Sequence, residues 1–315
     1  LTIEERLWPV KPGRTTLLSG DSFNLPRQEG FLYGALQPSY GMHSMDLPSS
    51  IFLGVVQGLT EFLPVSSSGH LVLFQNLLGY TEPALLFDVG LHVGTLAAVC
   101  LYFRTDLKNM AAESWIFAAQ LRHGEKAAKD LEHNAYASLT LWVVIGTLPT
   151  GLIGLFLRAP LERLFASLTA VGVMLLCTGT LLAAVKFIPA QYNRRRRVGL
   201  FAALAVGAAQ GLAIAPGLSR SGTTIVCGMF FKLERDLAAR FSFLLSLPAI
   251  LGAMIVQLSD LDGTRLNLLS WFLGFLTSAL VGLVALKVLM TLIHKGKIFY
   301  FAPYCWALGL LVFWL

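Results

Sequence analysis

Residues 57–70 read Gln57-Gly58-Leu59-Thr60-Glu61-Phe62-Leu63-Pro64-Val65-Ser66-Ser67-Ser68-Gly69-His70, a polar segment between two short apolar runs. The runs begin at Ile51 and Leu71, and neither alone reaches the roughly 20 residues that span a bilayer. Pro64 ends the first helix because it lacks a backbone N–H. The pattern predicts a re-entrant helical hairpin over about 49–79. Such backbone is tolerated at membrane depth only where protein buries it or where it lines a wet cavity.

The composition places the chain among polytopic helical membrane proteins. Of its 315 residues, 55% are hydrophobic and 13% are charged, against about 25% charged in a typical soluble domain. The mean hydropathy is +0.67. The net charge of +6 does not indicate a nucleic-acid partner, because the basic residues lie in short loops between apolar runs. The four cysteines have no metal-ligand spacing, so we expect them to act as small apolar residues.

Apolar runs in the rest of the chain predict six transmembrane helices, at about 84–103, 136–157, 168–187, 238–258, 268–290 and 298–315. They also predict an amphipathic helix around 107–121 and a second hairpin over about 199–231. The first 44 residues have no long apolar core and do not begin with Met, whereas a helix start follows Met45. We therefore expect residues 1–44 to be a disordered leader or one foreign to the natural protein. Residues 45–315 are expected to form a single membrane domain.

The two hairpins resemble each other in sequence. A shift of 153 positions superimposes Gly54, Gln57, Gly58, Leu59, Ser66, Ser68 and Gly69 on Gly207, Gln210, Gly211, Leu212, Ser219, Ser221 and Gly222. We interpret this as an internal repeat, with repeat one at about 49–187 and repeat two at about 199–315. Three spans separate the hairpins, so they enter from opposite faces and meet near the midplane. The predicted fold is an all-α membrane protein with an inverted-topology repeat.

Basic residues set the predicted orientation. One side collects the Lys and Arg of segments 104–129, 186–197, 232–240 and 287–297, whereas the other carries Arg158, Arg163 and Arg265. The positive-inside rule makes the rich side cytoplasmic. Both mature termini and the mouth of the first hairpin then face outward. We interpret Arg194–Arg197 as a topology determinant that contacts anionic lipid head groups.

Arg220 stands at the second tip, outside the basic loops. Placing Arg at the bilayer centre costs about 2.5–3.5 kcal/mol, so we expect an anionic partner. That partner is either Glu61 or a phosphate, which the guanidinium fork suits. The following helix start favours anions as well, and hydroxyls surround the arginine, from Ser219, Ser221 and Thr224. The alternative is a structural turn in which Arg220 only neutralises Glu61.

The first tip carries groups that suit phosphoryl transfer. Ser67 is a candidate nucleophile that needs a base or a metal, and His70 is near enough in sequence to act as base or leaving-group acid. Glu61 is a candidate ligand for a divalent cation, with Gln57 one helical turn earlier, and Mg²⁺ suits such a site. A structural role for His70 stays open. Asp88 and His92, one turn apart in the third apolar run, either line the same cavity or satisfy each other.

Two of these motifs, Gln57–His70 and Pro216–Thr224, resemble the signature motifs of the bacterial undecaprenyl-diphosphate phosphatases, the BacA/UppP family. Phe87–Leu96 and Phe241–Pro248 resemble it as well, and the similarity covers about 46–315. The resemblance implies an inner-membrane hydrolase that removes the terminal phosphate of undecaprenyl diphosphate on the periplasmic side. This reaction recycles the lipid carrier for peptidoglycan and other envelope polymers, and the family is associated with bacitracin resistance.

The resemblance also implies residue roles. Glu61 carries over as metal ligand or acid/base, Ser67 as candidate nucleophile, His70 as its base or proton donor, and Arg220 as the diphosphate clamp. The sequence does not decide whether Ser67, His70 or water attacks the phosphorus. Substrate hydrogen bonds are expected from Gln57, Ser66, Ser68, Ser219, Ser221 and Thr224. The family has Glu or Gln at the position of Gln57, which we give a supporting role in holding Mg²⁺ or Ca²⁺.

The expected partners are a polyprenyl diphosphate, membrane lipids and a second copy of the chain in a homodimer, without nucleic acid. A rival interpretation from another class is a lipid-carrier or ion-coupled transporter, because inverted repeats with broken helices are also the architecture of secondary transporters.

Overall fold

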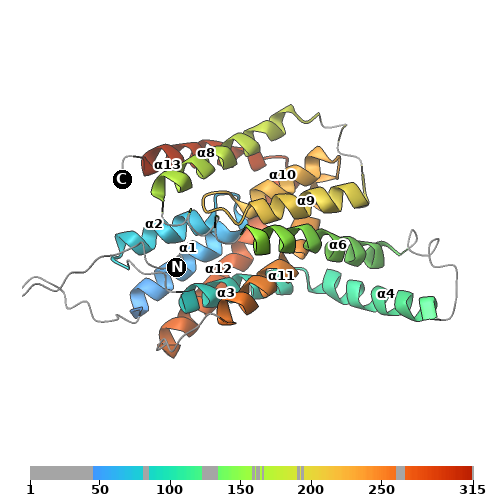
Figure 1. The fold of residues 1–315 in the computed structure, drawn as a ribbon, viewed down its shortest axis with the longest axis horizontal. Helices are drawn as coiled ribbons and strands as arrows, with labels where there is room; N and C mark the ends of the chain where they lie inside the picture. The colour runs from blue at the N-terminus through green and yellow to red at the C-terminus, as the bar shows by residue number, and fades with distance from the viewer. Residues whose placement is uncertain are drawn as a thin grey trace, which may run out of the picture. The chain divides into compact units, whose positions relative to one another are not determined.

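The computed structural model describes residues 45–80, 85–122, 134–157, 160, 164, 167–189, 192, 195–259 and 267–313, and the statements below concern these residues. The expected leader, the Arg194 end of the basic run, and Arg158, Arg163 and Arg265 lie outside them. The described residues form helices joined by short turns (Figure 1). The α-helices are α1 (Leu47–Phe62), α2 (Ser67–Leu77), α3 (Leu85–Tyr102), α4 (Arg104–Arg122), α6 (Ala135–Phe156), α8 (Leu168–Ala184), α9 (Leu200–Leu212), α10 (Arg220–Phe230), α11 (Arg235–Ser259), α12 (Leu268–His294) and α13 (Ala302–Val312). There are also two short 3₁₀ helices. The first, η2 (Val185–Phe187), follows α8, and the second, η4 (Ile298–Phe301), leads into α13.

Both predicted hairpins are present, as the pairs α1–α2 and α9–α10. Helix α1 begins after Met45, as predicted. Its N-terminus is capped by Asp46, whose Oδ1 accepts from the Ser49 N–H at 3.0 Å, and Pro48 lies in its first turn. The amphipathic helix expected at 107–121 is α4. The helix breaks therefore follow from Pro, Gly and Ser, which act locally.

Four helices of the described chain are long and apolar enough to cross a membrane: Ala135–Phe156, Leu168–Phe187, Arg235–Val256 and Leu268–His294. A fifth crossing is possible where α3 and α4 form one element bent by 72°. The last predicted span is shorter than expected, because η4 and α13 together cover Ile298–Val312. Many large apolar side chains are exposed, such as Phe156 at 80% and Phe201 at 77%, as expected for helices in contact with lipid. The chain is a multi-pass, all-helical membrane protein.

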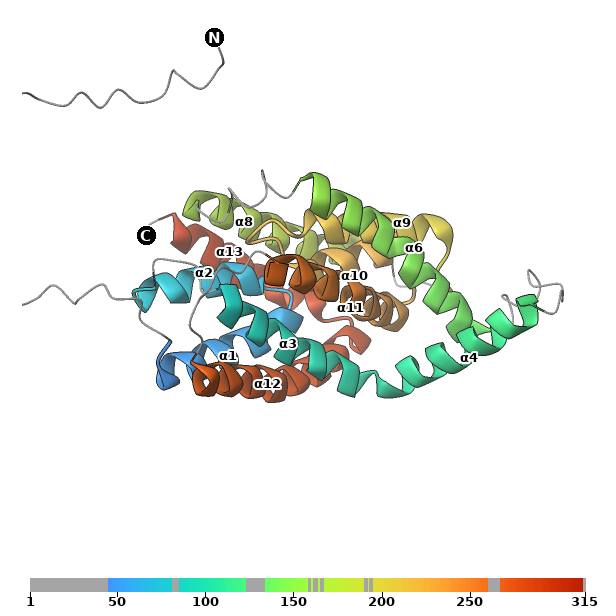
Figure 2. The same cartoon turned by 60° about the horizontal axis from the view of Figure 1, so that its bottom comes forward.

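The helices pack in a reciprocal pattern between the two repeats. Helix α1 of the first repeat packs on α12 of the second, and α9 of the second packs on α6 of the first (Figure 2). A Cβ on Gly54 would lie 2.8 Å from the Gly274 carbonyl oxygen, and one on Gly207 would overlap the Gly146 carbonyl. Equivalent glycines therefore let both hairpins approach a helix of the other repeat, which supports the predicted internal repeat.

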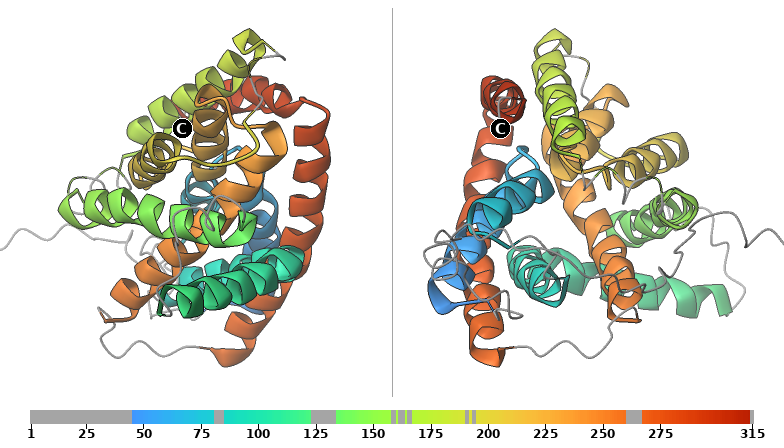
Figure 3. Two further views of the ribbon diagram at one scale, coloured as in Figure 1. Left: turned by 90° about the vertical axis from the view of Figure 1, so that its right-hand side faces the viewer. Right: turned by 60° about the vertical axis from the view of Figure 1, so that its left-hand side comes forward.

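The remaining helices complete this arrangement. Helices α8 and α13 lie side by side, and a Cβ on Gly172 or on Gly309 would lie about as close to the other's carbonyl oxygen, at 3.0 and 2.9 Å. The long α12, orange-red in Figure 3, borders the bundle in its left-hand view and also packs on α3. The aromatic core reaches the site through Phe62, whose ring centroid is 5.8 Å from that of Phe243 on α11. The residue after Glu61 is thus anchored in the core.

Candidate active site

The tips of the two hairpins meet. A Cβ on Gly69 would lie 3.5 Å from the Cα of Gly217, and one on Gly222 would lie 3.1 Å from the Cβ of Pro64. These two contacts are equivalent under the 153-residue shift. Gly217 has φ +90°, a conformation that glycine adopts without steric cost. The breaks of the two helices therefore face each other across one small region.

The serines that follow each break cap the next helix. Ser66 Oγ accepts from the Gly69 N–H at 3.4 Å, and Ser219 Oγ accepts from the Gly222 N–H at 3.2 Å. The hydroxyls of Ser68 and Ser221 lie 3.3 Å from these two cap oxygens. The four serines predicted to bind substrate thus stand at two helix N-termini, where free amides and the helix dipole favour an anion.

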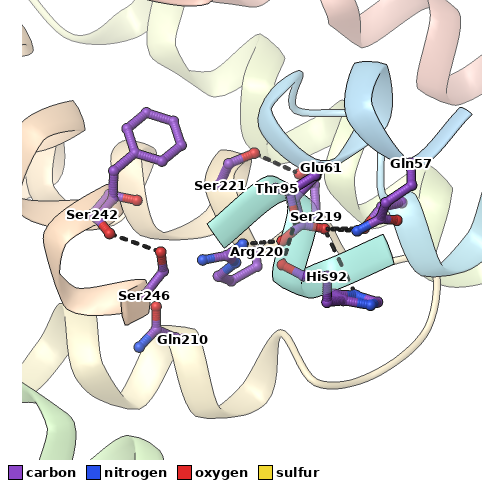
Figure 4. A network of polar contacts seen from close by, with 12 residues as sticks. Gln57, Glu61, His92, Thr95, Gln210, Ser219, Arg220, Ser221, Ser242 and Ser246 are labelled. Atoms are coloured by element: carbon purple, nitrogen blue, oxygen red, sulfur yellow. Dashed lines mark hydrogen bonds and ion pairs between the residues drawn. The ribbon is translucent and has the colours of Figure 1, made fainter. Parts of the chain in front are cut away.

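Glu61 is the centre of the site (Figure 4). Its carboxylate side chain is 6% exposed. Ser67 Oγ donates to Glu61 Oε2 at 2.6 Å, and Gln57 Nε2 donates to the same oxygen at 3.1 Å. Arg220, from the other hairpin, forms an ion pair with Glu61 Oε1. The carboxylate is therefore the point at which the two predicted tips join.

Arg220 has the anionic partner that its burial requires, since its side chain is only 17% exposed. Of the two partners that the sequence left open, this structure shows Glu61. Thr224 does not point its hydroxyl at the guanidinium: Oγ1 donates to the Arg220 carbonyl at 2.7 Å and shares a short hydrogen bond with Ser242. Thr224 thus ties the start of α10 to α11.

His70 lies beside Ser66 and Tyr304. Its Nδ1 is 2.7 Å from the Ser66 carbonyl oxygen, which can only accept, so Nδ1 carries the proton. Nε2 then accepts from the Tyr304 hydroxyl at 2.7 Å. Both ring nitrogens are engaged away from Ser67. Because Ser66 has φ +70°, which is uncommon for a residue other than glycine, the bond from His70 holds a strained turn in place.

His92 lies beside the Glu61 carboxylate, although nothing in the sequence favoured it over Asp88. Its Nε2 is 3.9 Å from Glu61 Oε2. The Asp88 carboxylate accepts from Gln75 Nε2 at 2.7 Å. Among the described residues no hydrogen bond joins the two side chains, and His92 Nδ1 bonds the backbone carbonyl of Asp88 at 2.8 Å. The sequence shows that an apolar helix carries a histidine, which marks His92 as a candidate. It does not show how the helix is rotated, and the rotation decides which side chain faces Glu61.

A divalent cation has suitable ligands at this site. Within the described part of the chain, no group of three or more His, Cys, Asp and Glu side chains is arranged for a metal. A cation at this site would therefore need ligands of another kind beside the carboxylate. Gln57, however, is fully buried, and its Oε1 has no hydrogen-bond partner among the described residues. A buried carbonyl oxygen beside a carboxylate is the donor set that hard divalent cations take. Gln57 and Glu61 therefore fit such an ion.

Comparison with known proteins gives the chain its relatives. The sequence profile described as "Bacitracin resistance protein BacA" matches residues 50–311. The protein named undecaprenyl-diphosphatase from Desulfatibacillum aliphaticivorans is 46% identical over 270 residues, which cover 85% of this chain and 97% of the relative. Proteins of the same name from Desulfosudis oleivorans and Methanobrevibacter smithii are 46% and 42% identical over 272 residues, covering 86% and 85% of this chain and 99% and 97% of the relatives. The chain belongs to the BacA family of bacitracin resistance proteins.

Proposed function

We propose that this chain is an integral-membrane phosphatase that hydrolyses undecaprenyl diphosphate to undecaprenyl phosphate and inorganic phosphate. The observation that carries the proposal is the convergence of Ser67, Glu61 and Arg220 from two hairpins on one buried point. A nucleophile, a base and a cation are the groups that phosphoryl transfer needs. The name shared by the relatives supports the choice of substrate.

In the first step, Ser67 Oγ attacks the terminal phosphorus, and the bridging P–O bond to the lipid phosphate breaks. Glu61 accepts the hydroxyl proton along the 2.6 Å hydrogen bond, so the base is Glu61 and not His70. Undecaprenyl phosphate leaves. Water then attacks the phosphorus and the Oγ–P bond breaks. Glu61 returns its proton to Ser67 Oγ, and inorganic phosphate departs with the oxygen and both protons of the water.

Arg220 exchanges its partner during this reaction. In the free enzyme it neutralises Glu61; with substrate, the guanidinium turns its fork of donors to the phosphate oxygens. The amides at the starts of α2 and α10, beside Ser66 and Ser219, stabilise the same negative charge. The ion pair therefore keeps Arg220 in place until an anion arrives.

Two further groups support the chemistry. A divalent cation, Mg²⁺ or Ca²⁺, held by Glu61 and Gln57 would neutralise charge on the phosphate oxygens when bound. We assign His70 to positioning, since its bond to the Ser66 carbonyl fixes the turn that presents Ser67.

We further propose that the protein lies in the bacterial inner membrane, with both mature termini and the mouth of the site on the periplasmic side. The excess of Lys and Arg in the loops of the opposite side supports this orientation. Membrane lipids surround the exposed apolar helices. The homodimer stays a prediction of the sequence.

The test is phosphate release from a C55 or C15 prenyl diphosphate by the purified protein with Mg²⁺ or Ca²⁺. We expect turnover that chelation abolishes and that added cation restores. Absence of release, together with transfer of labelled lipid across liposomes that contain the protein, would favour the transporter.

A further inference from the structure

We infer that His92 is a ligand of the divalent cation, so that the ion is held by one imidazole nitrogen together with the oxygens of Glu61 and Gln57. The inference deepens the proposed function and rests on it only where it links the ion to hydrolysis. His92 comes from α3, whereas Glu61 and Gln57 come from α1. The site therefore ties a helix of the bundle to the first hairpin.

The first argument is the arrangement of lone pairs. His92 Nδ1 is 2.8 Å from the Asp88 carbonyl oxygen, so in the neutral ring the proton is on Nδ1 and Nε2 is a bare acceptor. That acceptor faces the carboxylate oxygen Oε2 of Glu61 at 3.9 Å. In the neutral ring these two acceptors repel each other. Protonation of Nε2 would make the contact an ion pair, and a divalent cation between the two atoms would make it two metal–ligand bonds.

The second argument is the outer contact of His92. Histidines that bind metals almost always donate their other ring N–H to a backbone carbonyl, a carboxylate or water, because this fixes the tautomer and the ring orientation. The bond to the Asp88 carbonyl is such a contact. The Asp88 carboxylate, which could otherwise have bonded the imidazole ring, accepts a hydrogen bond from Gln75 instead.

The third argument is the orphaned amide oxygen. Gln57 is fully buried and donates to Glu61 Oε2 through Nε2 at 3.1 Å, while Oε1 has no hydrogen-bond partner in the described residues. A buried acceptor without a partner is unfavourable, and a half-turn of the terminal amide exchanges the oxygen and the NH2 group. The oxygen then faces the carboxylate and can bind a cation together with Glu61.

The donor set predicts which ion binds best. Carboxylate and amide oxygens suit Mg²⁺, Ca²⁺ and Mn²⁺, whereas an imidazole nitrogen favours transition metals. Mn²⁺ accepts both kinds of ligand. We therefore expect the protein to bind Mn²⁺ more tightly than Ca²⁺, and the nitrogen of His92 to account for much of the difference.

The experiment uses Mn²⁺ as the probe of the purified full-length protein. Pulsed electron paramagnetic resonance of bound Mn²⁺ should show electron spin-echo modulation from a directly bound ¹⁴N nucleus. The modulation should disappear in His92→Gln, with Mn²⁺ affinity lowered by at least about tenfold and Ca²⁺ affinity changed much less. The matched control is His294→Gln, because that histidine bonds Asp236 at 2.7 Å, outside the site, and its replacement should leave the modulation unchanged.

A second sample, the unaltered chain grown with ¹⁵N-histidine, does not depend on whether the variant folds. If a histidine nitrogen binds Mn²⁺, exchanging ¹⁴N for ¹⁵N should change the modulation. Bound Mn²⁺ without nitrogen modulation, or modulation that persists in His92→Gln, would overturn the assignment. Phosphate release is measured on the same samples. Nitrogen-bound Mn²⁺ without hydrolysis of a prenyl diphosphate would refute the proposed function and leave the ligand assignment standing. Hydrolysis of the prenyl diphosphate by protein whose Mn²⁺ is bound by oxygen atoms alone would overturn the ligand assignment and leave the proposed function standing.

Discussion

The two hairpins share one backbone design and differ in the chemistry that they carry. Under the 153-residue shift, the cap serines Ser66 and Ser219 make the same bonds to the following glycine amides, and the tips make two equivalent contacts. At three other positions the residues differ: Glu61, Ser67 and His70 of the first tip correspond to Ile214, Arg220 and Thr223 of the second. The repeated residues build the shape of the tips, and the unrepeated ones are those to which we assign the reaction.

The pair Ser67 and Arg220 is the most instructive difference. Each is the first residue of the second helix in its hairpin, and both contact the same carboxylate, one on each oxygen. Two equivalent positions thus approach Glu61 from opposite hairpins. One carries the proposed nucleophile and the other a cationic side chain, so the proposed reaction needs both tips.

Ser67→Ala gives the largest expected effect. If Ser67 attacks phosphorus, its removal should lower kcat by about 10⁴-fold or more, as the loss of a nucleophile does in other enzymes. The measurement is kcat for phosphate release from a prenyl diphosphate. The matched control is Ser68→Ala, because the Ser68 hydroxyl contacts only that of Ser66 among the described hydrogen bonds, and we expect a loss below about tenfold. Retained activity in Ser67→Ala would point to attack by water.

Arg220→Ala should lower kcat/KM by about 10³-fold, the effect of removing an arginine that stabilises a transferring phosphoryl group. Arg220→Lys should recover part of this loss, because it restores the charge but not the fork of donors. Both variants are assayed after circular dichroism has shown native helix content. Equal kcat/KM in Arg220→Ala and the unaltered protein would mean that the arginine only neutralises Glu61.

Gln57 and Gln210 occupy equivalent positions of the two repeats. Replacing each of them by Glu should have different effects on the stability of the protein. Gln210 donates to Thr150 Oγ1 at 3.3 Å and to the Leu245 carbonyl at 3.2 Å, so Gln210→Glu buries a charge against acceptors. It should destabilise the protein by about 3–5 kcal/mol. Gln57→Glu instead adds a ligand beside Glu61, and its stability should rise when a cation is added.

Thermal unfolding of the two variants with and without Mn²⁺ measures this contrast. A Tm that rises with Mn²⁺ more in Gln57→Glu than in the unaltered protein is expected, together with a low Tm of Gln210→Glu under both conditions. The same rise of Tm with Mn²⁺ in Gln57→Glu and in the unaltered protein would show that the residue at position 57 is not a ligand of the cation.

The sequence predicted the hairpins and the meeting of their tips, because helix breaks follow from Pro, Gly and Ser. It predicted an anionic partner for Arg220, because a buried charge requires one, and left Glu61 and a phosphate as alternatives. It did not predict the partners of His70, since the Tyr304 hydroxyl comes from a helix 234 residues away. Nor did it predict that His92 faces Glu61 while Asp88 does not. That choice depends on the rotation of α3, which is set where Gly94 lies against α12 too closely for a Cβ. Such rotations arise from long-range packing.

The smallest expected effect concerns how the two hairpins begin. Helix α1 starts with the Asp46 side-chain cap, whereas α9 starts at Gly199 without one. The hydrogen bonds from Ser49 to the carboxylate lower the pKa of Asp46. A lowered pKa means that the folded state holds the ionised form more strongly than the unfolded state does. The cap therefore contributes fully above the unfolded-state pKa of about 3.9, and its contribution falls as the pH drops through the lower folded-state value.

Asp46→Ala should lower the free energy of unfolding by about 1 kcal/mol at neutral pH, and the difference from the unaltered protein should shrink below about pH 4. Asp46→Asn keeps a capping oxygen without the titration, so it should lose less at neutral pH and show a weaker dependence on pH. Chemical unfolding in detergent at pH 7 and pH 3.5 measures both. A constant difference between Asp46→Ala and the unaltered protein at the two pH values would mean that the ionised cap contributes nothing, and that α1 and α9 begin with equal stability despite their different first residues.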